Sequence, residues 1–273
     1  MEQKYFKKRD EGDTGFVNSL SRGLAILESF DAETPALGIA EISRKTRLPK
    51  STVHRLIQTL CKLNYVISVS SSNKYMLGPR VLNLGYSVLS SLELREVARP
   101  YLERLSKSVG ETVNLAILDG WQLIYVERLK TQQIVNINLH IGSRLELYNT
   151  SMGRVLAAFQ EKKWIAQYLE YLRTLPEAES YSSDGGDSFR KILDDVRDQS
   201  FALNDEDLAP GLRSVAAPVR NKEQKVVGAV NIAVSSSRFA LENLKKDLLP
   251  PLQKTVSAIS AALGYAETKE RKT

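Results

Sequence analysis

The chain has 273 residues, of which 42% are hydrophobic and 26% are charged, and its formal net charge is +6. This length predicts two domains, because single hydrophobic cores usually stop growing near about 250 to 300 residues. A single cysteine excludes an internal disulfide and a multi-cysteine zinc site. The polar first residues lack the apolar core of a signal peptide and no apolar run is long enough to span a membrane, so we expect a soluble cytoplasmic protein.

Positive charge is concentrated toward the amino end. Residues 1–80 carry a net charge of +5, whereas residues 81–273 carry only +1. Between Glu41 and Glu93 there is no carboxylate, but there are eight lysine or arginine residues. A surface without carboxylates suits a polyanion such as DNA. A basic, solvated face on an ordinary domain is the alternative.

Three helices are predicted within and just before this basic stretch. The first begins after a cap at Asn18 and ends near Phe30, and the second ends at the turn "TRLPK", residues 46–50. A third helix follows at once, because proline suits a first helical turn while the residue before it is disfavoured in a helix. Its apolar face is formed by Val53, Leu56, Ile57, Leu60 and Leu63, and its opposite face is polar or cationic.

Two helices joined by a tight turn match the geometry that lets a recognition helix enter the major groove of DNA. Arg55 can donate two hydrogen bonds to guanine and Gln58 can pair with adenine, whereas Lys50 and the helix start suit phosphate. Each of these side chains could instead be merely solvated. The full set of predicted DNA contacts is Arg22, Lys50, Ser51, Thr52, His54, Arg55, Gln58 and Lys74.

A β-hairpin is predicted after the third helix. The segments "VISV" and "KYMLG" are β-prone and are joined by the polar turn "SSSN". Such a hairpin is a wing, and Lys74 near its tip would suit contacts to the DNA backbone. The alternative is a plain hairpin that only covers the helices. A further helix then carries an apolar stripe of Val81, Leu84, Val88 and Leu92, part of which we expect a partner chain to bury.

Beyond this helix the pattern changes to a mixed α/β domain, for which we expect an antiparallel sheet with helices packed on it. Helices are predicted near 93–108, 149–172, 188–198 and 241–265, and strands near 112–118, 121–129, 133–139, 200–204, 213–220 and 226–234.

The order of several motifs resembles the IclR-type transcriptional regulators over roughly residues 16–265. The matching segments are "SLSRGLAILESF", "LPKSTVHRLIQTL", "KYMLGPRVLNLGY", "GETVNLAILDG", "IGSRLELYNTSMGRVLAAF" and "GLRSVAAPVRN" followed by "VVGAVNIAVS". The resemblance implies an α+β protein, in which a winged helix-turn-helix domain is joined by a linker helix to a GAF- or profilin-like effector-binding domain. One segment departs from the family pattern, with Ser200 in place of a glycine and Asp207 in place of a glutamate.

With this resemblance we expect a DNA-binding domain at 16–78, a linker helix at 79–92 and an effector-binding domain at 93–265. A mobile segment at 1–15 and a polar tail at 266–273 flank them. The expected partners are a double-stranded DNA operator, a small-molecule effector and further copies of the chain, as a homodimer or a dimer of dimers. We expect no membrane association, no metal and no cofactor.

The resemblance also implies the residues of an effector site. These are Ile137, Leu145, Ser151, Met152, Asn204, Leu212, Ser214, Asn231 and Ala233. Their apolar members would hold a small carbon skeleton, while the hydroxyl and amide groups and the helix start near Ser151 would bind a carboxylate. Arg154 and Arg213 could add charge, although surface pairing is the commoner fate of arginine. The wording is closest to the branch that controls aromatic acid catabolism through the β-ketoadipate route.

Two alternatives stand beside an effector-controlled regulator. The second domain could serve only for oligomerisation, or it could be an enzyme that acts on a small acid. The enzyme is disfavoured because the chain has only His54, His140 and Cys61 as histidines and cysteine, with no glycine-rich phosphate loop and no serine nucleophile elbow. We therefore expect no enzymatic activity.

Overall fold

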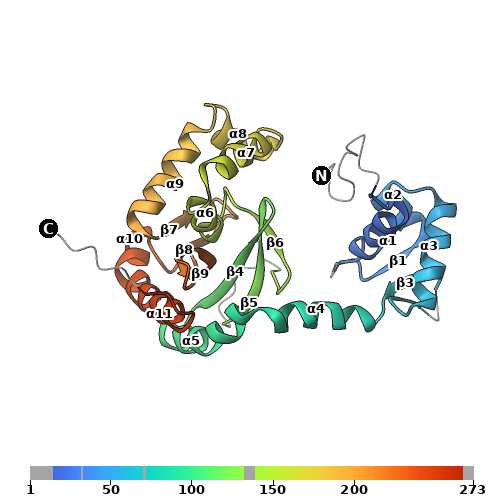
Figure 1. The fold of residues 1–273 in the computed structure, drawn as a ribbon, viewed down its shortest axis with the longest axis horizontal. Helices are drawn as coiled ribbons and strands as arrows, with labels where there is room; N and C mark the ends of the chain where they lie inside the picture. Colours follow the sequence, from blue (N-terminus) through green and yellow to red (C-terminus); the bar gives the residue numbers. More distant parts are fainter. Residues whose placement is uncertain (1–14, 32, 70–71, 132–138, 267–273) are drawn as a thin grey trace. The chain divides into compact units, whose positions relative to one another are not determined.

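A computed structural model describes residues 15–31, 33–69, 72–131 and 139–266, which fall into two compact units, Met1–Ser91 and Leu92–Thr273 (Figure 1). Each unit is considered by itself. None of the helices in these described ranges is both long and apolar enough to cross a membrane.

Unit 1 combines a small helical bundle with a three-stranded antiparallel sheet of order β1-β3-β2. The pairing of β2 with β3 confirms the predicted hairpin, and β1 adds a strand on the far side of β3 that the sequence did not predict. The elements are α1 (Asn18–Glu28), β1 (Ala36–Gly38), α2 (Ile39–Thr46), α3 (Lys50–Lys62), β2 (Val66–Ser68), β3 (Lys74–Leu77) and α4 (Arg80–Ser91).

The core of unit 1 is formed by the apolar faces of its first three helices. Ile26, Ile42, Val53 and Ile57 have no exposed surface, as expected for residues spaced three to four apart along amphipathic helices. Three details of the predicted pattern were wrong. Val17, not Asn18, is the residue before α1, and its side chain makes no capping hydrogen bond. Ala40 is exposed, and so is Leu63, because it lies just past the end of α3.

Unit 2 is built on one six-stranded sheet of order β6-β5-β4-β9-β8-β7, in which every neighbouring pair is antiparallel. This confirms the predicted fold class. The strands are β4 (Thr112–Asp119), β5 (Gln122–Leu129), β6 (Arg144–Glu146), β7 (Ala202–Asp205), β8 (Leu212–Arg220) and β9 (Val226–Ser235). The helices are α5 (Glu93–Val109), α6 (Ser151–Ala158), α7 (Lys162–Leu172), α8 (Glu179–Ser182), α9 (Asp187–Gln199), α10 (Leu241–Asn243) and α11 (Leu249–Ala262), with a 3-10 turn at Pro176–Ala178 and a π-helical turn at Leu244–Leu248.

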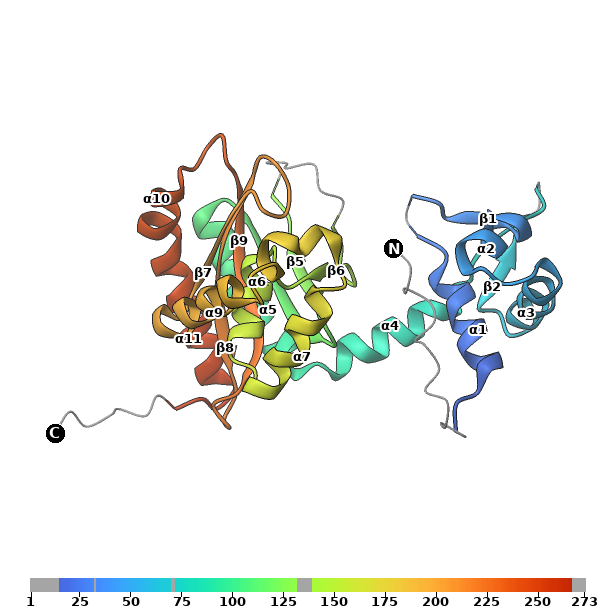
Figure 2. The same cartoon turned by 90° about the horizontal axis from the view of Figure 1, so that it is seen from above.

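The helices cover both faces of this sheet (Figures 1 and 2). Helices α5 and α11 pack on one face, where Leu94 lies against Gly228 of β9. Helix α6 packs on the other face, against β7, β8 and β9, and α9 packs on α6. The larger core cluster lies on the α6 side and includes Ala116, Tyr125, Leu156 and Phe189.

Several predicted boundaries in unit 2 differ from the structure. The helix expected at 149–172 is two helices, α6 and α7, separated near Phe159. The helix expected at 241–265 is α10, a π-helical turn and α11, and it ends at Ala262. Strand β6 was not predicted. The strand expected at 133–139 lies outside the described residues except for Leu139, which is not in a strand.

Candidate functional site

The turn between α2 and α3 is held by side chains of α2. Arg47 ends α2 in the left-handed region, with φ of 58°. The hydroxyl of Ser43 donates a hydrogen bond of 2.6 Å to the carbonyl of Leu48, and the hydroxyl of Thr46 donates one of 2.7 Å to the carbonyl of Ile42. Because Leu48 is also buried, the angle between the two helices is fixed by packing and by hydrogen bonds.

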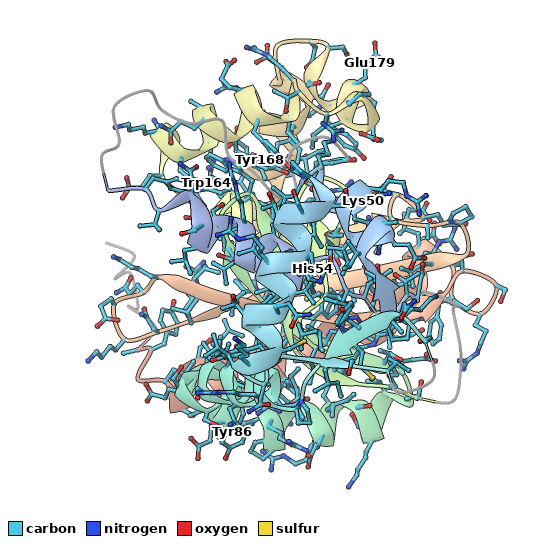
Figure 3. The ribbon with its side chains drawn as sticks, turned by 90° about the vertical axis from the view of Figure 1, so that its right-hand side faces the viewer. Lys50, His54, Tyr86, Trp164, Tyr168 and Glu179 are labelled. Atoms are coloured by element: carbon cyan, nitrogen blue, oxygen red, sulfur yellow. The ribbon has the colours of Figure 1, made fainter. Side chains whose placement is uncertain are left out.

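The face of α3 opposite the core carries the predicted DNA contacts. Lys50 and His54 lie on this face in Figure 3. Lys50, Ser51, His54, Arg55 and Gln58 are exposed, and Thr52 is half-buried. Among the residues that the structure describes, none of these six side chains has a hydrogen-bond or ion-pair partner. Their donors and acceptors therefore remain available to a ligand.

Other basic side chains of unit 1 have intramolecular partners. Lys45 donates a hydrogen bond of 2.7 Å to Asp31, and this bond holds the pKa of the Asp31 carboxyl well below its ordinary value. The Arg80 guanidinium donates a hydrogen bond of 2.9 Å to the carbonyl of Leu63, at the end of α3, and lies over the Tyr65 ring. Part of the positive charge between Glu41 and Glu93 thus stabilises the fold.

The two predicted DNA contacts outside α3 lie on separate elements. Lys74 is exposed at the start of β3, and its ammonium is 4.0 Å from the Glu41 carboxylate, at the limit of an ion pair. That carboxylate also accepts a hydrogen bond from the backbone of Gly38 at the start of α2, which lowers the pKa of Glu41. Arg22 is exposed on α1.

The predicted effector residues of the sheet share the face that α6 covers. Directly paired residues, and residues two apart along a strand, lie on the same face. Asn204 pairs with Ser214, which pairs with Ala233, and Asn231 and Leu212 each lie two residues from a member of this row. Leu145 pairs with Leu123, a member of the core cluster that packs against α6. Ile137 lies outside the described residues.

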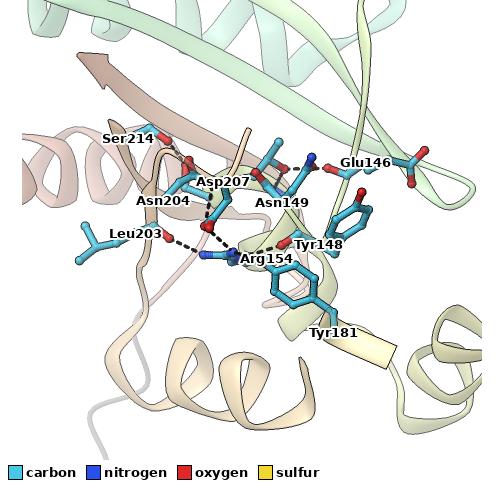
Figure 4. Close-up of polar contacts among 12 residues, drawn as sticks. Glu146, Tyr148, Asn149, Arg154, Tyr181, Leu203, Asn204, Asp207 and Ser214 are labelled. Carbon is cyan, nitrogen blue, oxygen red and sulfur yellow. Dashed lines mark hydrogen bonds and ion pairs between the residues drawn. The ribbon is translucent and has the colours of Figure 1, made fainter. Parts of the chain in front are cut away.

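Hydrogen bonds connect this face of the sheet with α6 and the segment before it (Figure 4). The hydroxyls of Ser151 and Ser214 are 2.7 Å apart. The amide nitrogen of Asn204 donates a hydrogen bond of 2.7 Å to the carbonyl of Asn149, but the side-chain amide oxygens of these two residues are buried without a partner among the described residues. Such unsatisfied acceptors favour a ligand that carries a donor, such as a hydroxyl group.

Helix α6 lies very close to its neighbours. All eight of its residues are buried, Met152 among them. Thr150 precedes the helix and accepts a hydrogen bond of 3.1 Å from the backbone of Gly153. A β-carbon at Gly153 would lie 2.4 Å from backbone atoms of Leu147, so this position requires glycine. A ligand bound between α6 and the sheet would have to replace the contact between Ser151 and Ser214.

Arg154 is the centre of a buried polar cluster, contrary to the surface pairing expected for it (Figure 4). Its guanidinium donates hydrogen bonds to the carbonyls of Tyr148 and Leu203, to the Tyr181 hydroxyl and to the Asp207 carboxylate, at 2.7 to 3.1 Å. The bond to Asp207 ties α6 to the loop after β7. Arg213 instead pairs with Asp205 near the surface, as expected.

The sequence analysis did not identify three polar residues that lie beside the effector row. Asn114 donates a hydrogen bond of 2.8 Å to Asn231, Arg128 donates one of 2.8 Å to Asn114, and Asn149 accepts the bond from Asn204. Asn114 had a usable signal, because it is the polar residue at an inward position of the apolar strand "VNLAIL". Arg128 had none, because arginine near a strand end is ordinarily exposed.

A surface hollow of about 310 Å³ lies between α7 and α9 and shares no residue with the effector row. Three of the side chains that line it are basic, and Arg197 pairs with Asp194 there. Its lining residues are Lys162, Ile165, Arg190, Leu193, Asp194 and Arg197. Because most of these side chains are exposed and partly paired, the chemistry for a specific small ligand is better developed beneath α6.

Comparison with known proteins matches both units. The IclR helix-turn-helix domain matches residues 19–68, and the C-terminal domain of bacterial IclR transcriptional regulators matches residues 86–261. The chain is similar to the Pca regulon regulatory protein of Pseudomonas putida, with 36% identity over 88% of this chain and 82% of that protein. An IclR family transcriptional regulator from Brucella abortus has a similar structure, with a TM-score of 0.76 and 31% identity over 92% of this chain and 94% of that one.

A structure from Microbacterium hydrocarbonoxydans, described as an IclR homolog complexed with 4-hydroxybenzoate, shares the fold with a TM-score of 0.77 and 24% identity, covering 90% of this chain and 98% of that one. The exposed polar face of α3, the hairpin of β2 and β3, and the matches over both units agree with one another. This chain therefore belongs to the IclR family of DNA-binding transcriptional regulators.

Proposed function

We propose that this regulator binds its operator through α3 and the β2–β3 hairpin, and that a small organic acid bound between α6 and the sheet of unit 2 changes its affinity for DNA. The observation that carries the proposal is the set of six unpartnered polar side chains on one face of α3, in a segment without carboxylates. In this proposal Arg55 and Gln58 contact bases, while Lys50, Ser51 and Lys74 contact phosphates.

The proposal for unit 2 is supported by the polar groups beneath α6. Ser151, Ser214 and Asn204 bring hydroxyl and amide groups together on a face that is otherwise apolar. The similar Microbacterium protein was crystallised with 4-hydroxybenzoate, and the Pseudomonas protein is named for the Pca regulon, so we propose an aromatic or short carboxylic acid as the effector. Because the site is closed by the bond from Ser151 to Ser214, binding would favour a different arrangement of α6.

DNA binding to the upstream intergenic region tests the first part of the proposal. Arg55→Ala should lose sequence-specific binding by about 1–3 kcal/mol per lost bidentate contact while leaving the fold intact. Arg104→Ala is the matched control, because Arg104 is an exposed arginine in unit 2 that lies over the Tyr101 ring. Wild-type binding by the Arg55 variant would show that α3 does not read bases.

Ligand response tests the second part. Ser151→Leu removes one of the two hydroxyls in contact and adds bulk at a buried position, so it should abolish the effect of acids on DNA binding while the protein without ligand still binds. An unchanged response would remove Ser151 from the site. If no acid affects the wild-type protein, unit 2 serves only for oligomerisation.

We further propose that the chain acts as a homodimer or a dimer of dimers in the cytoplasm, without enzymatic activity. Support comes from α4, in which none of the residues is buried and Leu82 and Tyr86 are each 73% exposed. An apolar helix face of this kind is normally covered by another chain. Light scattering on wild type and on Leu84→Asp measures the state, and an unaltered oligomer in the variant would assign the interface elsewhere.

A further inference from the structure

Arg128 occupies an unusual position on the face of the sheet that α6 covers. It pairs with Asn114, which pairs with Asn231, so the three residues form one row across β5, β4 and β9. The neighbouring Glu127 lies on the opposite face, where Arg95 pairs with it at 3.1 Å. No carboxylate of the described residues forms an ion pair with the half-buried Arg128, and its Nε is buried without a hydrogen-bond partner.

The other arginines that unit 2 holds largely out of solvent have acidic partners. Arg95 pairs with Glu127, Arg154 with Asp207, and Arg213 with Asp205. Burial lowers the pKa of Arg128, which shows that its charged form is poorly solvated. A cation in such surroundings is stabilised most by an anion, and leaving a buried donor unpaired costs free energy. The fold therefore retains a positive charge for which the described part of the chain supplies no counter-charge.

The arginine also fixes how the two asparagines are oriented. A guanidinium can only donate, so Asn114 must present its amide oxygen to Arg128, at 2.8 Å. The Asn114 nitrogen then donates to the Asn231 oxygen, also at 2.8 Å. Asn231 is left with its NH₂ group directed away from the row, and this group has no hydrogen-bond partner among the described residues. The row therefore ends in donors and not in acceptors.

The opposite polarity is found at the Ser214 end of the same face. The amide oxygens of Asn204 and Asn149 lack donors there, and the hydroxyls of Ser151 and Ser214 are adjacent. Ser214 pairs with Ala233, two residues from Asn231, so the α-carbons of Ser214 and Asn231 are diagonal neighbours about 7–8 Å apart. A single aromatic ring with substituents at opposite ends is of this size.

We propose that Arg128, through the row that it forms with Asn114 and Asn231, binds the carboxylate of the effector, and that the effector is an acid with a hydroxyl group at its other end. The hydroxyl would donate to Asn204 or Asn149. This inference rests on the proposed function of unit 2, and it adds both the orientation of the ligand and two residues, Arg128 and Asn114, that the family resemblance did not supply.

The test compares each acid with its amide, which keeps the shape of the ligand and removes its charge. Binding of 4-hydroxybenzoate, protocatechuate and adipate, and of the corresponding amides, is measured by calorimetry on the full chain. Wild type should prefer the acid by about tenfold or more, the effect of one charge-assisted contact. Arg128→Met should bring the ratio close to one, and Arg104→Met, the exposed control, should leave it unchanged.

A second variant keeps the test decisive if Arg128→Met does not fold. Asn231→Asp keeps the size of the side chain but replaces the free NH₂ group by an acceptor, so it should also abolish the preference for the acid. A wild-type ratio near one, or an unchanged ratio in the variants that fold, overturns the assignment of Arg128 while leaving effector binding intact. Failure of wild type to bind any of these acids or amides would instead contradict the proposed function of unit 2, and this inference with it.

Discussion

Replacing Arg154 by methionine should strongly destabilise unit 2. The side chain is 10% exposed and donates four hydrogen bonds, two of them to backbone carbonyls and one to Asp207. Methionine fills a similar volume but leaves these acceptors, including a carboxylate, without their donor. Breaking a largely buried charge pair in this way costs about 3–5 kcal/mol. With a urea dependence of about 2–3 kcal/mol per molar for a unit of this size, the unfolding midpoint should fall by about 1 M or more.

The assay is selective because both tryptophans of the chain, Trp121 and Trp164, belong to unit 2, with ring centroids 5.1 Å apart. Urea unfolding followed by tryptophan fluorescence therefore reports on this unit and not on unit 1. Arg190→Met is the control, since Arg190 is exposed and its partner Asp187 is 3.8 Å away, an arrangement that contributes less than about 1 kcal/mol. If the Arg154 variant unfolded at the wild-type midpoint, the cluster around it would not support the fold.

Two further predictions concern the surroundings of α6. Gly153→Ala should cost about 1–3 kcal/mol, because the new β-carbon would meet backbone atoms of Leu147 at 2.4 Å; Gly85→Ala, with nothing within 4 Å, should be neutral, and thermal unfolding followed by circular dichroism compares them. Burial raises the pKa of Glu146, although Gln122 and Tyr171 donate hydrogen bonds to it. The folded unit thus binds this proton more tightly than the unfolded chain, so stability from this group is fully present below the unfolded pKa and is lost as pH rises through the folded pKa. Glu146→Gln should remove that loss, so its urea midpoint relative to wild type should rise with pH; a constant difference would exclude the Glu146 proton as its source.

Elements with strong periodicity were predictable from the sequence, and elements defined by tertiary contacts were not. Helix α3 follows from the spacing of Val53 and Ile57 and from Pro49 before it. Strands β1 and β6 have three residues each, too few to show an alternation, and they exist because β3 and β5 offer free edges. The separation of α6 from α7 has no proline or glycine to mark it.

The candidate sites differ in the same way. The polar face of α3 depends on one helix, so the spacing of its residues was enough to predict which side chains are exposed. The effector row joins Asn204, Ser214 and Asn231 from three strands with Ser151 from a helix, and only a family resemblance could assemble these residues. Arg128 and Asn114 were missed because their importance lies in what they contact. Ser200, the departure from the family pattern, adopts the left-handed conformation that a glycine would favour at the end of α9.

The order of strands in unit 2 also constrains how the chain folds during synthesis. Strand β4 pairs with β9 at the middle of the sheet, and Asn114 and Asn231, joined by a hydrogen bond, are 117 residues apart in the chain. The ribosome therefore has to deliver nearly the whole chain before the sheet can close, whereas unit 1 needs only its own first 91 residues. A nascent or prematurely terminated chain passes through a stage in which the operator-reading unit is complete and the unit proposed to control it is still unfolded.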